Sequence, residues 1–239
     1  MQQYFVNGKA DKLVTITDKD TIKHMFNVMR LTEDDEVVLV FDDGIKRLAR
    51  VTNVQEHTFE IVDELSDNVE LPVQVVIASE FLAQKTTELG AHALWAFPAD
   101  WSVVKWDSKK LLKKADKLTK IAQGAAEQSK RNIIPQVKFF EKKSDFLTQL
   151  AVFNKIFVAY EESAKIGESA ALARELAQLS ADQQILFIFG PEGGLSPAEI
   201  AAFEKAGAVK VGLGPRIMRT ETAPLFALSS ISYVLELAK

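Results

Sequence analysis

With 239 residues, of which 47% are hydrophobic and 26% are charged, the chain can bury a sizeable core, and its composition excludes a mainly disordered protein. The absence of cysteine excludes disulfides and thiolate metal sites, and no apolar run approaches the ~20 residues of a membrane helix, so we expect a cytoplasmic protein without a membrane partner. The net charge of −4 does not by itself indicate a protein that binds nucleic acid. Residues 1–70, however, hold 15 acidic against 8 basic residues, so the rest of the chain carries a net positive charge.

The first 70 residues contain short apolar segments separated by turns, a pattern typical of a small β-barrel or sandwich. The expected strands cover residues 4–6, 36–41, 46–51 and 58–62. Asp42-Asp43-Gly44 favours a hairpin turn, because glycine tolerates positive φ. Apolar residues at the helical period predict a helix over residues 20–30. A polar segment ending in Pro72 predicts the boundary between domains 1–70 and 72–239.

Beyond Pro72, strands alternate with helices, which predicts an α/β domain with a mostly parallel sheet covered on both faces. The expected strands are 73–78, 94–97, 157–160, 185–189 and 209–213, and the expected helices are 82–89, 109–130, 169–178, 197–206 and 223–237. Seven lysines between Lys105 and Lys120 are opposed only by Asp107 and Asp116. Such a helix is more often a solvated surface, but it can also follow the phosphates of a nucleic acid.

The strongest motif joins the strand 185–189 to Gly190-Pro191-Glu192-Gly193-Gly194. Ser196 is the expected N-cap of the next helix, Pro197 suits its first position and Glu199 completes a capping box. Loops at the carboxyl ends of parallel strands bind ligands in α/β sheets, and glycine lets a ligand approach the backbone. A tight turn without a ligand fits this segment equally well. The motif is neither a dinucleotide fingerprint nor a P-loop.

A second strand, 209–213, ends at Gly214 and leads into another loop, so two strand-end loops can form one pocket. In this loop Arg216, Arg219 and Glu221 lie among apolar residues, which indicates paired or ligand-bound charges. A surface salt bridge is the commoner explanation of such a cluster. Thr222 is expected to cap the last helix.

Together the two loops resemble the bacterial 16S ribosomal RNA (uracil-N3)-methyltransferase family of the SPOUT superfamily. The similar segments are Gly190-Pro191-Glu192-Gly193-Gly194 and Leu213-Gly214-x-Arg216-Ile217-Met218-Arg219-Thr220-Glu221-Thr222-Ala223. Further similar signatures are His24-Met25-Phe26-Asn27-Val28-Met29-Arg30, Gln84-Lys85-Thr86-Thr87-Glu88-Leu89-Gly90 and Ala126-Glu127-Gln128-Ser129-x-Arg131-x-x-x-Pro135. The resemblance covers nearly the whole chain, and the combination is specific although each segment alone is not.

The resemblance implies an N-terminal PUA-like β-barrel that helps to hold RNA and a C-terminal SPOUT α/β domain with a trefoil knot. It further implies S-adenosylmethionine (SAM) as cofactor, methylation at N3 of a uridine in 16S rRNA of the small ribosomal subunit, and a homodimer. A non-catalytic ribosomal-RNA-binding protein and a SPOUT methyltransferase acting on transfer RNA are the alternatives. His24, His57 and His92 lack ligand spacing, so no metal site is expected.

Site residues follow from the same resemblance. A buried Arg219 is the expected cation that stabilises an anionic uracil, with Arg216 as alternative and Glu221 to orient the arginine. The expected cofactor-binding residues are Phe189, Gly190, Pro191, Glu192, Gly193, Gly194, Leu213, Gly214, Ile217, Met218 and Thr220. RNA contacts are expected from Arg30, Lys85, Trp101, Lys109, Lys113, Gln128, Ser129 and Arg131. Arg30 is equally suited to an ion pair with Glu33 or Asp34.

The chain departs from the family pattern in two places. Ser79-Glu80-Phe81 is shorter and acidic where the family usually has a basic turn. Asp100-Trp101-Ser102-Val103-Val104 stands where the family tends to show Glu-Arg-Ser before an apolar pair. A positive RNA contact is thereby lost, and Trp101 can substitute for it by stacking on a base. The alternative is that Trp95, Trp101 and Trp106 are core or dimer-interface residues, and for Trp95 this alternative is the expectation.

Overall fold

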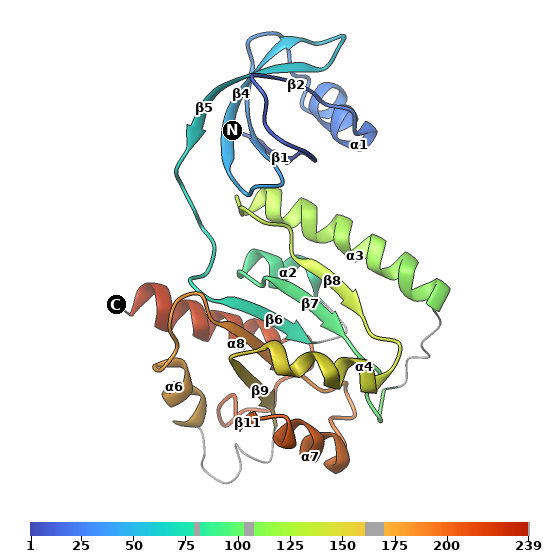
Figure 1. Ribbon diagram of the computed structural model, residues 1–239, viewed down its shortest axis with the longest axis vertical. Coiled ribbons are helices and arrows are strands. Elements are labelled where there is room, and N and C mark those ends of the chain that lie inside the picture. Colours follow the sequence, from blue (N-terminus) through green and yellow to red (C-terminus); the bar gives the residue numbers. More distant parts are fainter. Residues whose placement is uncertain (79–81, 103–107, 161–169, 239) are drawn as a thin grey trace. The chain divides into compact units, whose positions relative to one another are not determined.

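The computed structural model describes residues 1–78, 82–102, 108–160 and 170–238 (Figure 1). The chain forms two compact units, Met1–Glu70 with Ala126–Ile133, and Leu71–Ala125 with Ile134–Lys239. The first break lies next to the expected boundary at Pro72, but nothing in the sequence pattern indicated that residues 126–133 group with the first unit. The departure at residues 79–81, the pair Val103-Val104 and Lys105 lie outside the described residues.

The first unit is built on a five-stranded sheet in the order β1-β3-β4-β5-β2. Its strands are β1 (Gln3–Phe5), β2 (Leu13–Thr15), β3 (Glu36–Val40), β4 (Lys46–Asn53) and β5 (Thr58–Leu65). β1 is parallel to β3 and the other pairs are antiparallel. Register shifts in β4 after Leu48 and Val51 bend the sheet, as bulges do. β2 was not among the expected strands, because only Val14 of its three residues is buried and the apolar signal is weak.

One helical segment closes the core of this unit. The helix expected over residues 20–30 is α1 (Lys19–Ile22), continued by the π-helix η1 (Lys23–Val28). Asp18 caps it by accepting a hydrogen bond from the Thr21 N–H at 2.7 Å. Met25 is fully buried and belongs to the same core cluster as Leu39 and Phe59. The apolar helical period seen in the sequence therefore faces the sheet.

The second unit contains a six-stranded, wholly parallel sheet in the order β11-β9-β10-β6-β7-β8. Its strands are β6 (Gln74–Ala78), β7 (Ala93–Ala96), β8 (Gln136–Phe139), β9 (Lys155–Ala159), β10 (Gln184–Ile188) and β11 (Ala208–Val211). Five of the six strands were predicted. β8 was missed because only half-buried and exposed residues make it up, so its apolar signal is weak.

Helices cover this sheet on both faces, as Figure 1 shows. They are α2 (Ala83–Glu88), α3 (Ser108–Gln128), α4 (Lys143–Thr148), η2 (Gln149–Val152), α6 (Ala170–Leu176), α7 (Pro197–Lys205), α8 (Ala223–Ser232) and η3 (Tyr233–Leu237). Ile185 and Phe187 pack with residues of α6 and α8, whereas Leu186 and Ile188 pack with residues of α4 and α7. Because successive strand residues face opposite sides, a continuous apolar strand fills two cores.

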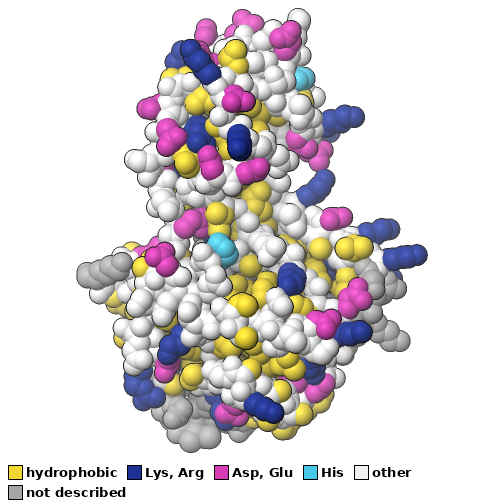
Figure 2. Space-filling view, viewed as in Figure 1, with side chains coloured by type: hydrophobic (Ala, Val, Ile, Leu, Met, Phe, Trp, Pro, Cys, Tyr) yellow, Lys and Arg dark blue, Asp and Glu magenta, His cyan; other side chains and the backbone are white. Residues whose placement is uncertain are grey.

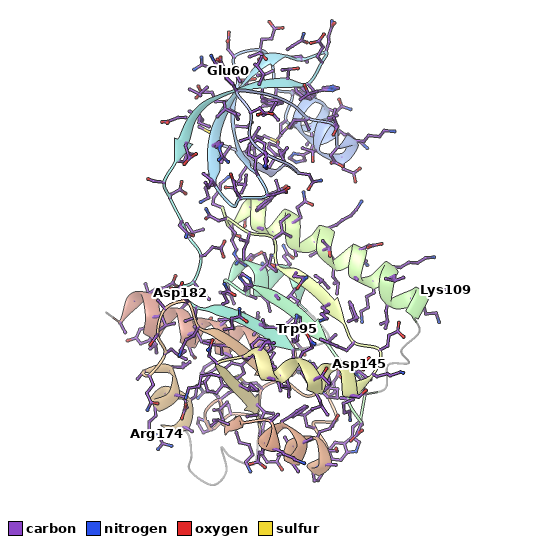
Figure 3. The ribbon with its side chains drawn as sticks, in the orientation of Figure 1. Glu60, Trp95, Lys109, Asp145, Arg174 and Asp182 are labelled. Atoms are coloured by element: carbon purple, nitrogen blue, oxygen red, sulfur yellow. The ribbon has the colours of Figure 1, made fainter. Side chains whose placement is uncertain are left out.

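Trp95 lies in the second of these cores, which is one of the two places expected for it. It is 7% exposed and makes edge contacts with Phe140, Phe146 and Phe153 (Figure 3).

Within the described residues no helix combines the length and apolar character needed to cross a bilayer.

Candidate active site

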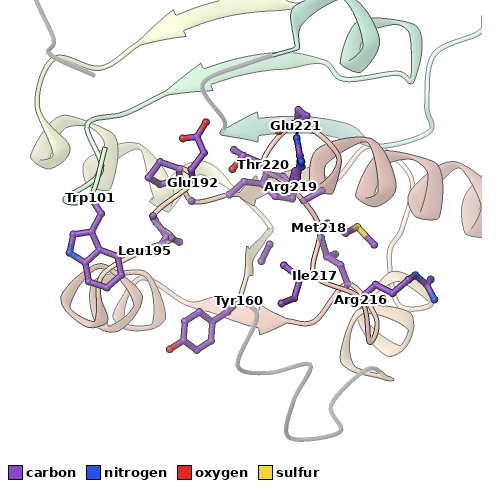
Figure 4. A pocket seen from close by; sticks show the side chains of 18 of the residues that line it. Trp101, Tyr160, Glu192, Leu195, Arg216, Ile217, Met218, Arg219, Thr220 and Glu221 are labelled. Carbon is purple, nitrogen blue, oxygen red and sulfur yellow. Dashed lines mark ion pairs between the residues drawn. The ribbon is translucent and has the colours of Figure 1, made fainter. Parts of the chain in front are cut away.

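The site lies in the second unit, where the carboxyl ends of β9, β10 and β11 meet. These strands are parallel neighbours, so the loops that follow them emerge at one edge of the sheet. The end of β9 and the loops that follow β10 and β11 line a cavity of about 960 Å³ (Figure 4). All eleven residues predicted for cofactor binding line this cavity, as do Arg216, Arg219 and Glu221. The structure therefore brings the two sequence motifs together.

The first wall is the loop of residues 190–194, which follows β10. The Gly194 N–H donates a hydrogen bond to the Pro191 carbonyl at 2.8 Å, and Gly194 has a φ of +78° that favours glycine. A Cβ added to Gly190 would stand 2.9 Å from the carbonyl carbon of Gly194. The loop is thus folded so tightly that residue 190 has no room for a side chain.

The loop ends at the start of α7, as the capping motif predicted. The Ser196 hydroxyl accepts a hydrogen bond from the Glu199 N–H at 3.1 Å, and the Glu199 carboxylate accepts one from the Ser196 N–H at 2.9 Å. Pro197 is the first residue of the helix. This reciprocal pair fixes the end of the loop against a rigid element.

The second wall is the loop of residues 213–221, which follows β11 and leads into α8. Gly214 has a φ of +96°, and the Thr222 and Ala223 N–H groups donate to the Arg219 carbonyl at 2.9 and 3.0 Å. Thr222 occupies the N-cap position of α8, but its side chain makes no capping hydrogen bond. The predicted side-chain cap is therefore wrong, because Thr222 has helical rather than extended backbone angles.

The three charges of this loop lie at the surface, and the expected burial of Arg219 is wrong. Its side chain is 87% exposed and lies 4.0 Å from Glu221, which is 51% exposed. Figure 4 shows the Arg216 guanidinium directed away from the centre of the pocket, whereas Arg219 lies beside Glu221 at its rim. Ile217 is 78% exposed although it is apolar. These side chains are therefore open to solvent in the part of the chain that the structure describes.

Five lining residues were missed by the sequence analysis: Ala159, Tyr160, Leu195, Pro197 and Ala223. Ala159 and Tyr160 stand at the end of β9, and the Tyr160 N–H donates to the Val211 carbonyl at 3.1 Å. The order of strands in the sheet brings them to the cavity, and no local pattern reveals that order. Trp101, predicted as an RNA contact, also lines the cavity.

The remaining predicted RNA contacts have different surroundings. Lys109 and Lys113 are exposed on α3, and Figures 2 and 3 show cationic side chains projecting from this helix, with Lys109 at its start. Lys85 is half-exposed and forms an ion pair with Glu88 at 2.8 Å. Arg30 is exposed with a φ of +56°. Gln128 is exposed and Ser129 half-buried.

Arg131 requires a correction. Its side chain is 3% exposed and forms a buried ion pair with Glu70, which also accepts hydrogen bonds from the Asn132 and Ile133 N–H groups. The Gln3 side-chain amide donates to the Arg131 carbonyl at 2.7 Å. Arg131 therefore holds the first unit together, and its guanidinium is not presented to an RNA in this structure.

Comparison with known proteins identifies the family. A model described as an RNA methyltransferase domain matches residues 71–232, and one described as an RNA methyltransferase PUA domain matches residues 16–64. The ribosomal RNA small subunit methyltransferase E of Bacillus subtilis (strain 168) is 41% identical, with 100% of this chain and 99% of the relative covered. That of Mycobacterium tuberculosis is 31% identical, with 91% and 86% covered.

Two solved structures resemble the chain from end to end. A putative methyltransferase from Legionella pneumophila in complex with SAM is 25% identical over 96% of each chain, with a TM-score of 0.81. A ribosomal RNA small subunit methyltransferase E from Neisseria gonorrhoeae bound to S-adenosyl methionine is 25% identical over 98% of each chain, with a TM-score of 0.78. The chain therefore belongs to the RNA methyltransferase family with a PUA domain, together with the ribosomal RNA small subunit methyltransferase E proteins.

Proposed function

We propose that the chain is a SAM-dependent methyltransferase that methylates N3 of a specific uridine in 16S rRNA of the small ribosomal subunit. One observation carries the proposal: the two motif loops close around a single cavity in a chain 41% identical to a ribosomal RNA small subunit methyltransferase. The assignment of N3 of a uridine as the methylated atom rests on the resemblance of these two loops to the (uracil-N3)-methyltransferase family.

The residues around the cavity fit SAM. A volume of about 960 Å³ lies within the ~300–1,000 Å³ typical of small-molecule sites. The loop glycines let a ligand approach backbone groups, and the exposed Ile217 and half-buried Met218 offer apolar surface for an adenine ring. We assign cofactor binding to the 190–194 loop and to Leu213, Gly214, Ile217, Met218 and Thr220. SAM supplies an electrophilic methyl group when bound.

The protein has to position the acceptor base and stabilise its charge. Uracil N3 carries a proton, and its loss leaves an anionic ring, so a nearby cation favours the reactive form. Arg219 lines the cavity, is exposed to an incoming base and forms an ion pair with Glu221 at 4.0 Å. We assign stabilisation of the uracil anion to Arg219 and its orientation to Glu221. Arg216 is a weaker candidate because its guanidinium points away from the pocket.

The RNA has to be held through its phosphates. Exposed Lys109 and Lys113 on α3, together with Lys110 and Lys117, give this helix a cationic surface. Each phosphate contact that is removed should reduce the slope of log affinity against log salt by about 0.7–0.9. Arg30, at an exposed left-handed position of the first unit, is assigned to the same RNA.

We further infer a homodimer with a knotted carboxyl-terminal region. Phe226, Tyr233 and Leu237 are spaced by seven and four residues along α8 and η3, so they share one helical face, and they are 37%, 62% and 73% exposed. A second copy of the chain would cover this apolar face. The knot rests on the family resemblance alone.

One experiment separates this proposal from its alternatives. Labelled SAM is incubated with the protein and, in parallel, with small ribosomal subunits, naked 16S rRNA and transfer RNA, and the modified base is then located. Label on a uridine N3 of the subunit supports the proposal. Label on transfer RNA favours the alternative of a SPOUT methyltransferase that acts on transfer RNA. RNA binding without SAM affinity in calorimetric titration favours a non-catalytic RNA-binding protein.

A further inference from the structure

Four polar side chains form a network beside the 190–194 loop, and none of them is assigned a part in cofactor binding or methyl transfer. The Lys143 ammonium lies 2.5 Å from Asp100 Oδ1 and 2.6 Å from Glu199 Oε1. The Ser196 hydroxyl donates a hydrogen bond to Asp100 Oδ2 at 2.5 Å. This Asp100 network joins the turn after β7 to the first residue of α4 and to the start of α7.

The Glu199 carboxylate is the centre of the network. It is 1% exposed, and a buried carboxylate is unfavourable unless it is paired and hydrogen-bonded. Oε1 accepts from the Lys143 ammonium and from the Asp100 N–H at 2.9 Å, and Oε2 accepts from the Ser196 N–H. The capping box needs only Ser196 and Glu199. Asp100 and Lys143 therefore add a connection to a different part of the chain.

That connection fixes the turn that carries Trp101. The Ser102 N–H donates to the Ala99 carbonyl at 3.1 Å, so Asp100 and Trp101 are the central residues of a tight turn. A Cβ added to Gly193 would stand 3.2 Å from Trp101 Cβ and 3.3 Å from its carbonyl oxygen. The turn thus packs directly on the 190–194 loop.

The Trp101 indole is positioned without being buried. The residue lines the cavity yet is 51% exposed, and Figure 4 shows its ring at the edge of the pocket, opposite Met218 and Ile217. Core packing does not hold such a ring, whereas Trp95 is held by three phenylalanines. The polar contacts of the preceding residue, Asp100, are what fix the turn.

We propose that Lys143, Asp100 and Glu199 are positioning residues that hold the Trp101 indole at the mouth of the cavity, where it stacks on the base that accepts the methyl group. This inference rests on the proposed function, because it needs a nucleobase as acceptor. Enzymes that modify bases commonly hold an extruded base between flat or apolar side chains, and tryptophan offers a large stacking surface.

The ionisation of the network agrees with this role. The hydrogen bonds from Lys143 and then from Ser196 lower the pKa of Asp100. Burial acts against the charge on Lys143, but the hydrogen bonds to Asp100 and Glu199 outweigh it and raise the pKa of Lys143. Both groups are therefore charged at neutral pH, and the contacts that hold the turn persist under working conditions.

A double-mutant cycle tests whether Lys143 acts through Trp101. The full chain and the variants Lys143→Met, Trp101→Ala and the double variant are compared by kcat/KM for small ribosomal subunits at saturating labelled SAM. Each single change should lower kcat/KM about tenfold, the effect of losing one base stack. The double variant should lose no more than the worse single variant. Losses that multiply to about a hundredfold would overturn the proposal.

Matched controls separate positioning from general damage. Lys142→Met removes the same charge from the exposed neighbouring residue and should leave kcat/KM unchanged. Lys143→Arg keeps the positive charge and should retain most of the kcat/KM that Lys143→Met loses. The affinity for SAM should stay within about twofold of the unaltered chain in all of these variants. Should Lys143→Met fail to fold, Asp100→Ala replaces it in the cycle, because that side chain is 45% exposed. A Lys143→Met variant as active as Lys142→Met contradicts the proposal.

A second readout does not depend on the activity. In a variant with Trp95 and Trp106 replaced by phenylalanine, fluorescence comes from Trp101 alone. Adding Lys143→Met should raise the acrylamide quenching constant of Trp101 about twofold, because the released ring samples more solvent. Unchanged quenching overturns the network. If the unaltered chain methylates no RNA, the proposed function fails, while quenching still reports whether the network holds the ring.

Discussion

Replacing Gly190 with alanine tests whether the tightness of the 190–194 loop is what shapes the cofactor cavity. The new Cβ would stand 2.9 Å from the Gly194 carbonyl carbon and 3.1 Å from its Cα, whereas carbon atoms prefer about 3.5–4.0 Å. Both neighbours are backbone atoms, so the loop has to open. Overpacking costs about 1–3 kcal/mol. If that energy is taken from binding, SAM affinity falls about 5- to 150-fold.

Calorimetric titration with SAM measures the loss. Gly193→Ala meets Trp101 atoms at 3.2 and 3.3 Å and should lose less affinity than Gly190→Ala. Gly124→Ala, in α3, meets nothing within 4 Å, gains helix propensity and should bind SAM as the unaltered chain does. If Gly190→Ala bound SAM within about twofold of the unaltered chain, the packing argument for this loop would be refuted.

Three further outcomes follow from the structure. Arg219→Ala should lower methyl transfer about 10²–10³-fold with SAM affinity nearly unchanged; equal loss in both assays would indicate a structural arginine. Arg131→Met should destabilise the first unit by up to about 3–5 kcal/mol in denaturant unfolding, since Glu70, which is only 17% exposed, loses its ion-pair partner; unchanged stability would contradict a structural role. Hydrogen bonds from Lys143 and Ser196 lower the pKa of Asp100 in the folded chain. The Asp100 carboxylate therefore contributes its full stabilisation above the pKa of the unfolded chain, about 3.9, and loses it as the pH falls through the lower pKa of the folded chain. Below about pH 4, the Tm of the Asp100→Asn variant should therefore decrease less steeply with falling pH than the Tm of the unaltered chain. An equal decrease in the variant and the unaltered chain would argue against this assignment.

Local patterns in the sequence predicted much of the fold and of the cavity. The expected apolar strand 185–189 is present as β10, within one residue at each end. The expected capping box at Ser196 starts α7, and Gly194, in the loop between them, has the positive φ that favours glycine. Such features depend on neighbouring residues, because strand alternation, helix capping and positive φ are settled within a few positions. The same reasoning failed for β2 and β8, whose residues bury too little apolar surface to stand out.

The tertiary structure alone decided which distant groups meet. Arg131 is buried because Glu70, 61 residues earlier in the chain, lies against it, whereas the family resemblance had suggested an exposed RNA contact. Tyr160 reaches the cavity because β9 lies between β10 and β11. Asp100 meets Glu199 across 99 residues. Strand order and ion pairing depend on how the whole chain packs, so they leave no periodic signal in the sequence.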